Sequence, residues 1–207
     1  MERDIDWKDI EYLSQGTADQ QDVYELLTRR RWLERLLAYH PILVGTVPLD
    51  LNVPGSDLDL VCELPAEDGG AAFERELLHW FGRMDGFAIA KREVGGLARC
   101  KASFVCEGWP VEIFAQPEPT DRQNGYVHMI VEYRLLRLLG EPFKSCVRAL
   151  KREGVKTEPA FARLLGLEGD PYVAMLGLAE RSDEALFALF GRWQEGEIAW
   201  TERGGEL

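Results

Sequence analysis

The stretch LVGTVPLDLNVPGSDLDLVCEL, residues 43–64, alternates apolar and acidic residues in its second half. Side chains of a β-strand point to alternate faces, so Leu58, Leu60 and Cys62 share one face of the predicted strand. Asp57 and Asp59 share the other face, about 6–7 Å apart along the strand. Two carboxylates this close repel each other unless a positive charge lies between them. A divalent cation such as Mg²⁺, which binds carboxylate oxygens, explains the pair best.

A third acid lies inside another apolar strand. Glu112 follows Val111 and precedes Ile113, where a charge is costly unless it is paired or bound to a metal. Two interpretations are open. Glu112 completes a metal site with the two aspartates, or it forms an ion pair with Lys101 or Arg99 on the neighbouring strand.

Two further features indicate a place for phosphate groups. Gly45 allows a close backbone approach, and the hydroxyl of Thr46 with the nearby amides can hold phosphate oxygens. In the predicted strand LARCKASF, Arg99, Lys101 and Ser103 share one face. This face either receives phosphate charge or is an ordinary polar sheet face.

The pattern along the whole chain predicts an α+β fold. Residues 6–16, 18–40 and 69–84 have helical spacing, and the second of these helices must end by His40 because Pro41 follows. Strands are predicted over 42–47, 56–64, 87–94, 97–107 and 110–116, the last three as an antiparallel meander. Further helices are predicted over 126–139, 143–153, 159–165, 171–180 and 182–193. We therefore expect a core over 1–120, with a mixed or antiparallel sheet flanked by helices, and a helical region over 121–207 packed on it as one unit.

Composition narrows the class of protein. The 207 residues carry a net charge of −12, and 46% are hydrophobic, with no charge-free segment long enough to span a bilayer. The charged start MERDIDWKDIEYL is unlike a secretory signal. The four cysteines form no CxxC pair and there are three histidines, which disfavours zinc and suggests free thiols in the cytoplasm. No basic stripe is present, and TRRRWLERLL is typical of a solvated helix face, so we expect no long nucleic acid and no membrane as partner.

The helical part supplies candidates for a substrate pocket: Gln123, His128, Glu132 and Lys156. His128 and Glu132 are one helical turn apart and so share a face. His128 is either a base or hydrogen-bond donor to substrate or a buried, satisfied histidine. Lys156 and Thr157 precede a helix whose N-terminus would attract an anion, and we expect Thr157 to cap that helix.

Together, Gly45-Thr46, the SDLDL strand and the acid in VEI resemble the signature of the DNA polymerase β-type nucleotidyltransferase superfamily. The strings PILVGTVPLD, QNGYVHMIVEYRLL and GVKTEPAFARLLGLEGDPY resemble a bacterial branch of it, over about residues 39–172. The resemblance implies a minimal nucleotidyltransferase fold, with a mixed sheet flanked by helices. It implies Asp57, Asp59 and Glu112 as catalytic and metal-binding residues, and Gly45 and Thr46 as nucleotide-binding residues. We expect Ser56 and Lys101 to bind the nucleotide as well.

The chain departs from the family pattern at three places. Thr46 stands where serine is commoner, which keeps the hydroxyl. The loop VPLDLNVPG lacks the Arg or Lys that many members carry, and Glu112 stands where aspartate is commoner.

We therefore expect a Mg²⁺- or Mn²⁺-dependent enzyme that transfers a nucleoside monophosphate from an NTP to a hydroxyl of a small-molecule or protein acceptor. Two alternatives are a catalytically degenerate module that binds a nucleotide or partner, and a toxin-like nucleotidyltransferase regulated by a partner protein.

Overall fold

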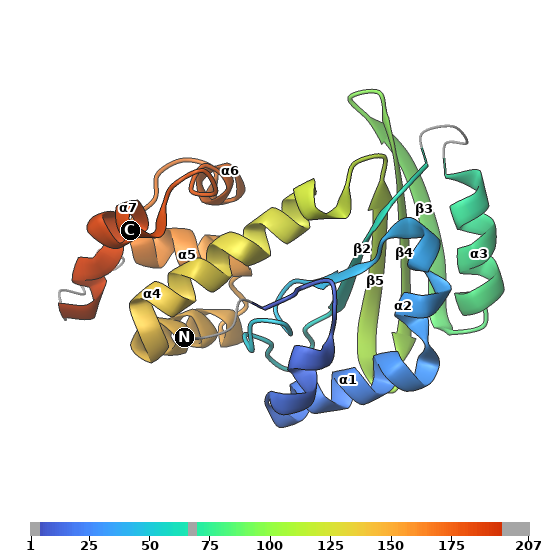
Figure 1. The fold of residues 1–207 in the computed structure, drawn as a ribbon, viewed down its shortest axis with the longest axis horizontal. Coiled ribbons are helices and arrows are strands. Elements are labelled where there is room, and N and C mark those ends of the chain that lie inside the picture. Colours follow the sequence, from blue (N-terminus) through green and yellow to red (C-terminus); the bar gives the residue numbers. More distant parts are fainter. Residues whose placement is uncertain (1–4, 66–69, 196–207) are drawn as a thin grey trace, which may run out of the picture. The chain divides into compact units, whose positions relative to one another are not determined.

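A single mixed sheet of five strands organises the computed structural model, which describes residues 5–65 and 70–195. The strands are β1 (Ile42–Val44), β2 (Leu58–Glu63), β3 (Asp85–Val94), β4 (Leu97–Cys106) and β5 (Trp109–Gln116). Their order is β1-β2-β5-β4-β3, with β2 and β5 parallel and the other neighbours antiparallel. The predicted α+β class and the β3-β4-β5 meander are confirmed (Figure 1).

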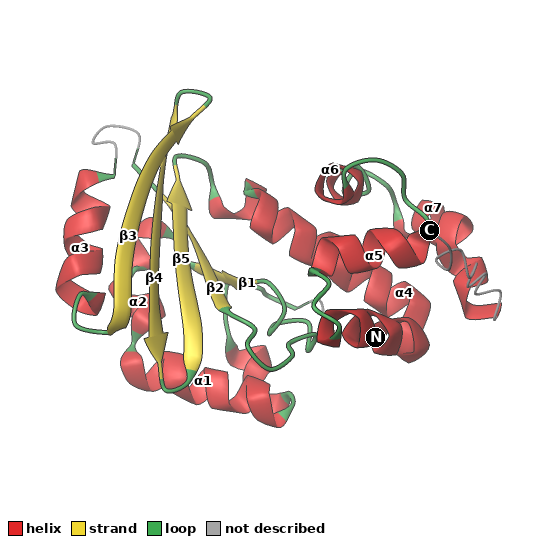
Figure 2. Ribbon diagram, turned by 180° about the vertical axis from the view of Figure 1, so that it is seen from behind, coloured by secondary structure: helices red, strands yellow, loops and turns green. Residues whose placement is uncertain are grey.

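Helices of the N-terminal part cover one face of this sheet (Figures 1 and 2). They are η1 (Glu11–Gln15), α1 (Ala18–Arg30), α2 (Trp32–Arg35), η2 (Leu37–Tyr39) and α3 (Ala71–Phe81). The single helix predicted over 18–40 is wrong, because Arg31 is left-handed (φ 57°) and ends α1. The predicted end before Pro41 is confirmed, since η2 ends at Tyr39.

The core lies between these helices and the sheet. Leu58, Leu60 and Cys62 are fully buried on the face that the alternation predicted. The turn at Arg31 places the Trp32 ring in this core, where it meets Phe81 and Phe104 edge to face at 5.6 and 5.4 Å between ring centroids. All four cysteines are free thiols, as predicted.

The chain divides into two compact units, residues 1–129 and 130–207. The helical elements after the sheet are η3 (Thr120–Arg122), α4 (Asn124–Arg152), α5 (Thr157–Leu165), α6 (Pro171–Leu176), α7 (Asp183–Phe190) and η4 (Gly191–Glu195). The predicted break between 139 and 143 is present, because Gly140 is non-helical (φ 75°) and Pro142 follows it. Asp170 caps α6 by accepting from the amides of Tyr172 and Val173, also as predicted.

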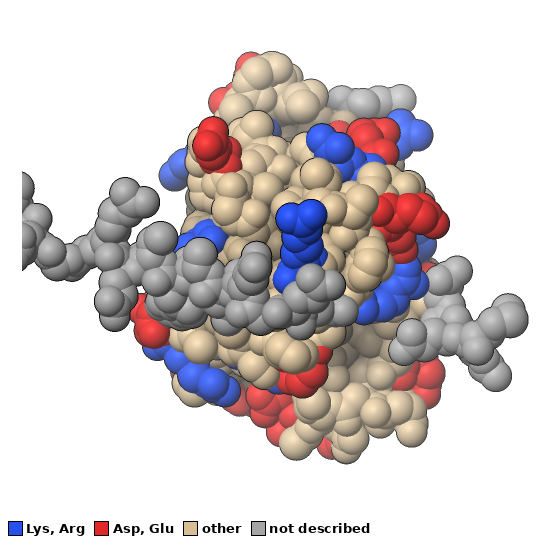
Figure 3. Space-filling model, turned by 90° about the vertical axis from the view of Figure 1, so that its left-hand side faces the viewer, with Lys and Arg blue, Asp and Glu red and all other residues tan. Residues whose placement is uncertain are grey.

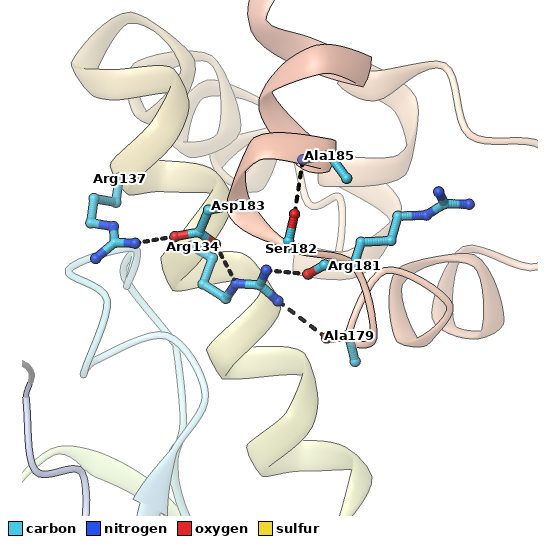
Figure 4. A network of polar contacts seen from close by, with 7 residues as sticks. All are labelled: Arg134, Arg137, Ala179, Arg181, Ser182, Asp183 and Ala185. Atoms are coloured by element: carbon cyan, nitrogen blue, oxygen red, sulfur yellow. Dashed lines mark hydrogen bonds and ion pairs between the residues drawn. The ribbon is translucent and has the colours of Figure 1, made fainter.

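One arginine organises the start of α7 (Figure 4). The Arg134 side chain donates to Asp183 (2.7 Å) and to the carbonyl oxygens of Ala179 (3.2 Å) and Arg181. Arg137 forms a second ion pair with Asp183. The hydrogen bond from Arg134, with the charges of both arginines, lowers the pKa of Asp183 below its ordinary value.

The surface shows no obvious segregation of charge on the face seen in Figure 3, where acidic and basic side chains are scattered among other residues of the described chain. Within residues 5–65 and 70–195, no helix is long and apolar enough to cross a membrane.

Candidate functional site

The structure brings two of the three predicted acids together. Asp59 of β2 and Glu112 of β5 are register partners on adjacent parallel strands, and Val44 of β1 is opposite Asp59 on its other side. Both acids are half-buried. Asp57 stands just before β2, two residues from Asp59, and is also half-buried. Register partners point to the same face of a sheet, so the pair lies on the face opposite the buried leucines.

The backbone of Gly45 lies directly against Asp59. Gly45 has φ +80°, and a Cβ added to it would stand 2.5 Å from Oδ2 of Asp59. No larger residue fits there without displacing the carboxylate. The neighbour of this backbone is therefore the aspartate itself, and contact of Gly45 with a nucleotide stays a prediction.

Hydrogen bonds fix the loop that follows Gly45. The amide of Leu51 donates to the carbonyl of Thr46 (2.9 Å), and the buried side chain of Gln20 donates to the carbonyl of Val47 (2.9 Å). At the far end of the loop, the hydroxyl oxygen of Ser56 accepts from the amide of Val53 (2.9 Å). Thr46 and Ser56 are thus held by local bonds at the two ends of the segment that joins β1 to β2.

Glu112 forms an ion pair with Lys101 of β4, which is the alternative that the sequence left open. Lys101 is 47% exposed and Glu112 is 32% exposed. An ion pair this accessible to water contributes at most about 1 kcal/mol. Both groups can therefore exchange this partner for a more strongly charged one at low cost.

The donor set fits a hard cation in kind, because Asp57, Asp59 and Glu112 all offer carboxylate oxygens. Within the described part of the chain, however, no three or more His, Cys, Asp or Glu side chains gather as metal ligands. One of these three acids, Glu112, is instead paired with the Lys101 ammonium.

Basic residues continue along the same face of the sheet. Arg92 of β3 is the register partner of Arg99 of β4, and Lys101 is opposite Ala90. The sequence predicted that Arg99, Lys101 and Ser103 share a face, and the register adds Arg92 to them. Sequence reasoning missed Arg92 because the register across the β3–β4 turn carried no separate signal.

The predicted pocket residues divide between the two units. In unit 1–129, Gln123 is buried and its amide nitrogen donates to the carbonyls of Cys62 (2.8 Å) and Glu118 (2.9 Å). His128, also buried, lies in the same unit. Glu132 is buried in unit 130–207, and this burial raises its pKa well above the ordinary value. A shared pocket stays a prediction.

The start of α5 differs from the expectation. Lys156 rather than Thr157 is the N-cap residue, and no side chain caps the helix there. The hydroxyl of Thr157 instead accepts from the Lys151 ammonium (2.8 Å), so capping by Thr157 is wrong. Thr157 is the first helical residue rather than the residue before the helix, so it does not stand at the N-cap position.

Fold and site together define an α+β protein whose mixed sheet sets two carboxylates side by side on neighbouring strands, with a glycine loop against one of them. The chain belongs to the family described as Domain of unknown function (DUF4269), whose model matches residues 25–178. A search of curated proteins found no match.

Several solved structures are similar to the chain at low identity. The structure of Cid1 described for its RNA terminal uridylyl transferase activity is 11% identical, with a TM-score of 0.48, over 69% of this chain and 45% of that one. The polymerase core of TRAMP, an RNA surveillance complex, is 14% identical with a TM-score of 0.46, over 90% and 60%. The GLD-2/RNP-8 complex is 10% identical with a TM-score of 0.46, over 96% and 78%. This chain spans about half the length of the Cid1 structures.

Proposed function

We propose that the protein is a nucleotidyltransferase that moves a nucleoside monophosphate from an NTP to a hydroxyl of a small-molecule or protein acceptor. The observation that carries this proposal is the register of Asp59 with Glu112, with the Gly45 backbone against the Asp59 carboxylate. Transfer of a phosphoryl group depends mainly on positioning and on charge. The adjacent carboxylates could hold the cation that supplies this charge, and the Gly45 backbone limits where the Asp59 carboxylate can lie.

Asp57 and Asp59 would hold Mg²⁺ or Mn²⁺, which when bound supplies positive charge that offsets the triphosphate. The Thr46 hydroxyl would donate a hydrogen bond to a phosphate oxygen. The Ser56 hydroxyl could donate a second such hydrogen bond, because its oxygen accepts from the Val53 amide and its own O–H group is not used in that bond. Lys101 would turn from Glu112 to a phosphate oxygen.

In the proposed reaction the acceptor hydroxyl attacks the α-phosphate of the NTP. The acceptor hydroxyl oxygen forms a bond to the α-phosphorus of the NTP, and the bond from this phosphorus to the bridging oxygen of the β-phosphate breaks. Pyrophosphate leaves with that bonding pair. The hydroxyl proton passes to the Glu112 carboxylate after Lys101 has turned from it to the phosphate.

The acceptor class follows from charge. A chain with net charge −12 repels a polynucleotide at long range, which favours a small molecule or a protein as acceptor. The four free thiols agree with a reducing, cytoplasmic setting.

Thermal unfolding with each NTP, with and without Mg²⁺ or Mn²⁺, tests the site. A ligand at a hundred times its Kd adds about 2.7 kcal/mol, which raises the midpoint by roughly 5–10 °C in a chain of this size. We expect this metal-dependent shift to disappear in an Asp57→Asn, Asp59→Asn double variant. It should persist in Asp22→Asn, a matched change at an exposed position of α1. An unchanged shift in the double variant would refute the proposal.

A second candidate, a module that binds a nucleotide without turnover, is favoured by the Lys101–Glu112 ion pair. Pyrophosphate release with a panel of hydroxyl acceptors separates the two. For an enzyme, Glu112→Gln should slow release by about 10²-fold or more while nucleotide binding persists. Binding with no release from the wild type, across the whole panel, would select the module.

A further inference from the structure

Two arginines face each other near the turn between β3 and β4. Arg92 and Arg99 are direct register partners, so their side chains leave the sheet on the same face as Asp59 and Glu112. Arg92 is exposed and Arg99 is half-buried. Lys101 lies two residues from Arg99 on the same face. Figures 1 and 2 show this end of the hairpin extending beyond β5.

This pairing is unfavourable without a further partner, because like charges directly opposite each other repel. Neither arginine side chain makes a hydrogen bond or ion pair with another residue in the described part of the chain. The Nε atom of Arg99 is buried there without an acceptor. The chain has 36 acidic residues against 24 Lys and Arg, so carboxylate partners are abundant elsewhere. An anion from outside the chain would satisfy the buried donor and remove the repulsion together.

Distance along the sheet separates this arginine pair from the acids. Arg99 is four residues from Ser103, which is the register partner of Glu112. Four residues of a strand span about 13 Å. Between the two places this face carries Lys101, with Ala90 of β3 and Phe114 of β5 opposite it, and the exposed Ala88 lies opposite Ser103. One small molecule lying along β4 could therefore reach from the arginines to the acids.

We propose that Arg92 and Arg99 bind the phosphate of the acceptor, so that the acceptor is a small phosphomonoester with a free hydroxyl. This inference rests on the proposed function. Guanidinium groups suit a phosphate dianion because they donate two parallel hydrogen bonds to it. A pair of arginines at one place matches a single phosphoryl group, whereas a polynucleotide backbone needs a long basic track.

Binding of ribose 5-phosphate, inorganic phosphate and ribose to the full chain tests this site. Titration calorimetry gives the affinity, and the ¹⁵N–¹H signals of arginine Nε groups show which arginines respond. We expect ribose 5-phosphate and phosphate to bind, ribose not to bind, and the Nε signal of Arg99 to shift. Arg99→Gln and Arg92→Gln should each weaken binding about tenfold. Arg83→Gln, an exposed arginine between α3 and β3, should leave it unchanged.

The outcomes separate this inference from the proposed function. If NTP binds but neither ribose 5-phosphate nor inorganic phosphate does, the inference is overturned and the proposed function stands. The same holds if Arg83→Gln weakens binding as much as Arg99→Gln. If ribose 5-phosphate binds as expected while no NTP binds, the proposed function fails and the phosphate site remains. Competition between ribose 5-phosphate and NTP would assign the arginines to the triphosphate and overturn an acceptor site. Should Arg99→Gln not fold, the exposed Arg92→Gln carries the test.

Discussion

Replacing Gly45 by alanine tests whether the loop after β1 is fixed against Asp59. The new methyl group would lie 2.5 Å from Oδ2 of Asp59, well inside the 3.4 Å at which ordinary contact begins. The left-handed backbone costs alanine about 1 kcal/mol. Moving the Asp59 side chain off its rotamer adds about 1 kcal/mol. We therefore expect Gly45→Ala to lower the free energy of unfolding by about 2 kcal/mol.

Gly55 provides the matched control. It lies in the same loop with φ +87°, and a Cβ added there meets nothing within 4 Å. Gly55→Ala thus has the same backbone strain without the contact, and the loss of freedom in the unfolded chain is equal in both variants. We expect a loss of about 1 kcal/mol for Gly55→Ala. Because 1 kcal/mol corresponds to roughly 2–4 °C at this chain length, Gly45→Ala should unfold roughly 2–4 °C below Gly55→Ala.

Thermal unfolding followed by circular dichroism measures both variants. A double-mutant cycle adds Asp59→Ala, which removes the carboxylate that the methyl group meets. The two changes should be coupled by about 1 kcal/mol, since the contact exists only when both the new methyl group and the Asp59 carboxylate are present. Equal losses for the two glycine variants, together with an additive cycle, would show that Gly45 does not lie against Asp59.

Three further predictions concern stability. The hydrogen bond from Arg134 lowers the pKa of Asp183, so the contribution of Asp183 to stability is present above its ordinary pKa of 3.8 and is lost as pH falls toward the lowered pKa. In urea unfolding, Asp183→Asn should cost about 1 kcal/mol at pH 7 and clearly less at pH 3. An equal cost at both pH values would contradict this. Burial raises the pKa of Glu132, so this carboxyl ionises at lower pH in the unfolded chain than in the folded one, and stability falls as pH rises above 4.5. The stability of Glu132→Gln minus that of the wild type should therefore be larger at pH 7 than at pH 4. A difference that does not change with pH would count against a buried carboxyl. Trp32→Ala, which empties the fully buried ring site, should cost about 3–5 kcal/mol in urea unfolding, whereas a loss below about 1 kcal/mol would mean that the ring is not in the core.

The sequence predicted those elements whose start, end or buried face is marked by neighbouring residues. Alternation of period two placed β2 and turned Leu58 to the core, and Pro41 marked the end of the helical segment before β1. The break at Arg31 was missed. Glycine and proline mark helix ends in a sequence, but an arginine that adopts the left-handed conformation carries no such mark. In the structure the next residue, Trp32, is buried in the core.

The sequence by itself determined which residues are available to the site: the aspartates on one face of a strand, the glycine before them and an isolated glutamate in a later strand. Only the tertiary structure decided that Asp59 lies beside Glu112, that Gly45 touches Asp59, and that Arg92 is opposite Arg99. Strand periodicity is a local property of the chain, so it can be read from neighbouring residues. The register between strands is set by the packing of the whole sheet on its core, because a shift of one residue would turn every buried side chain to the other face.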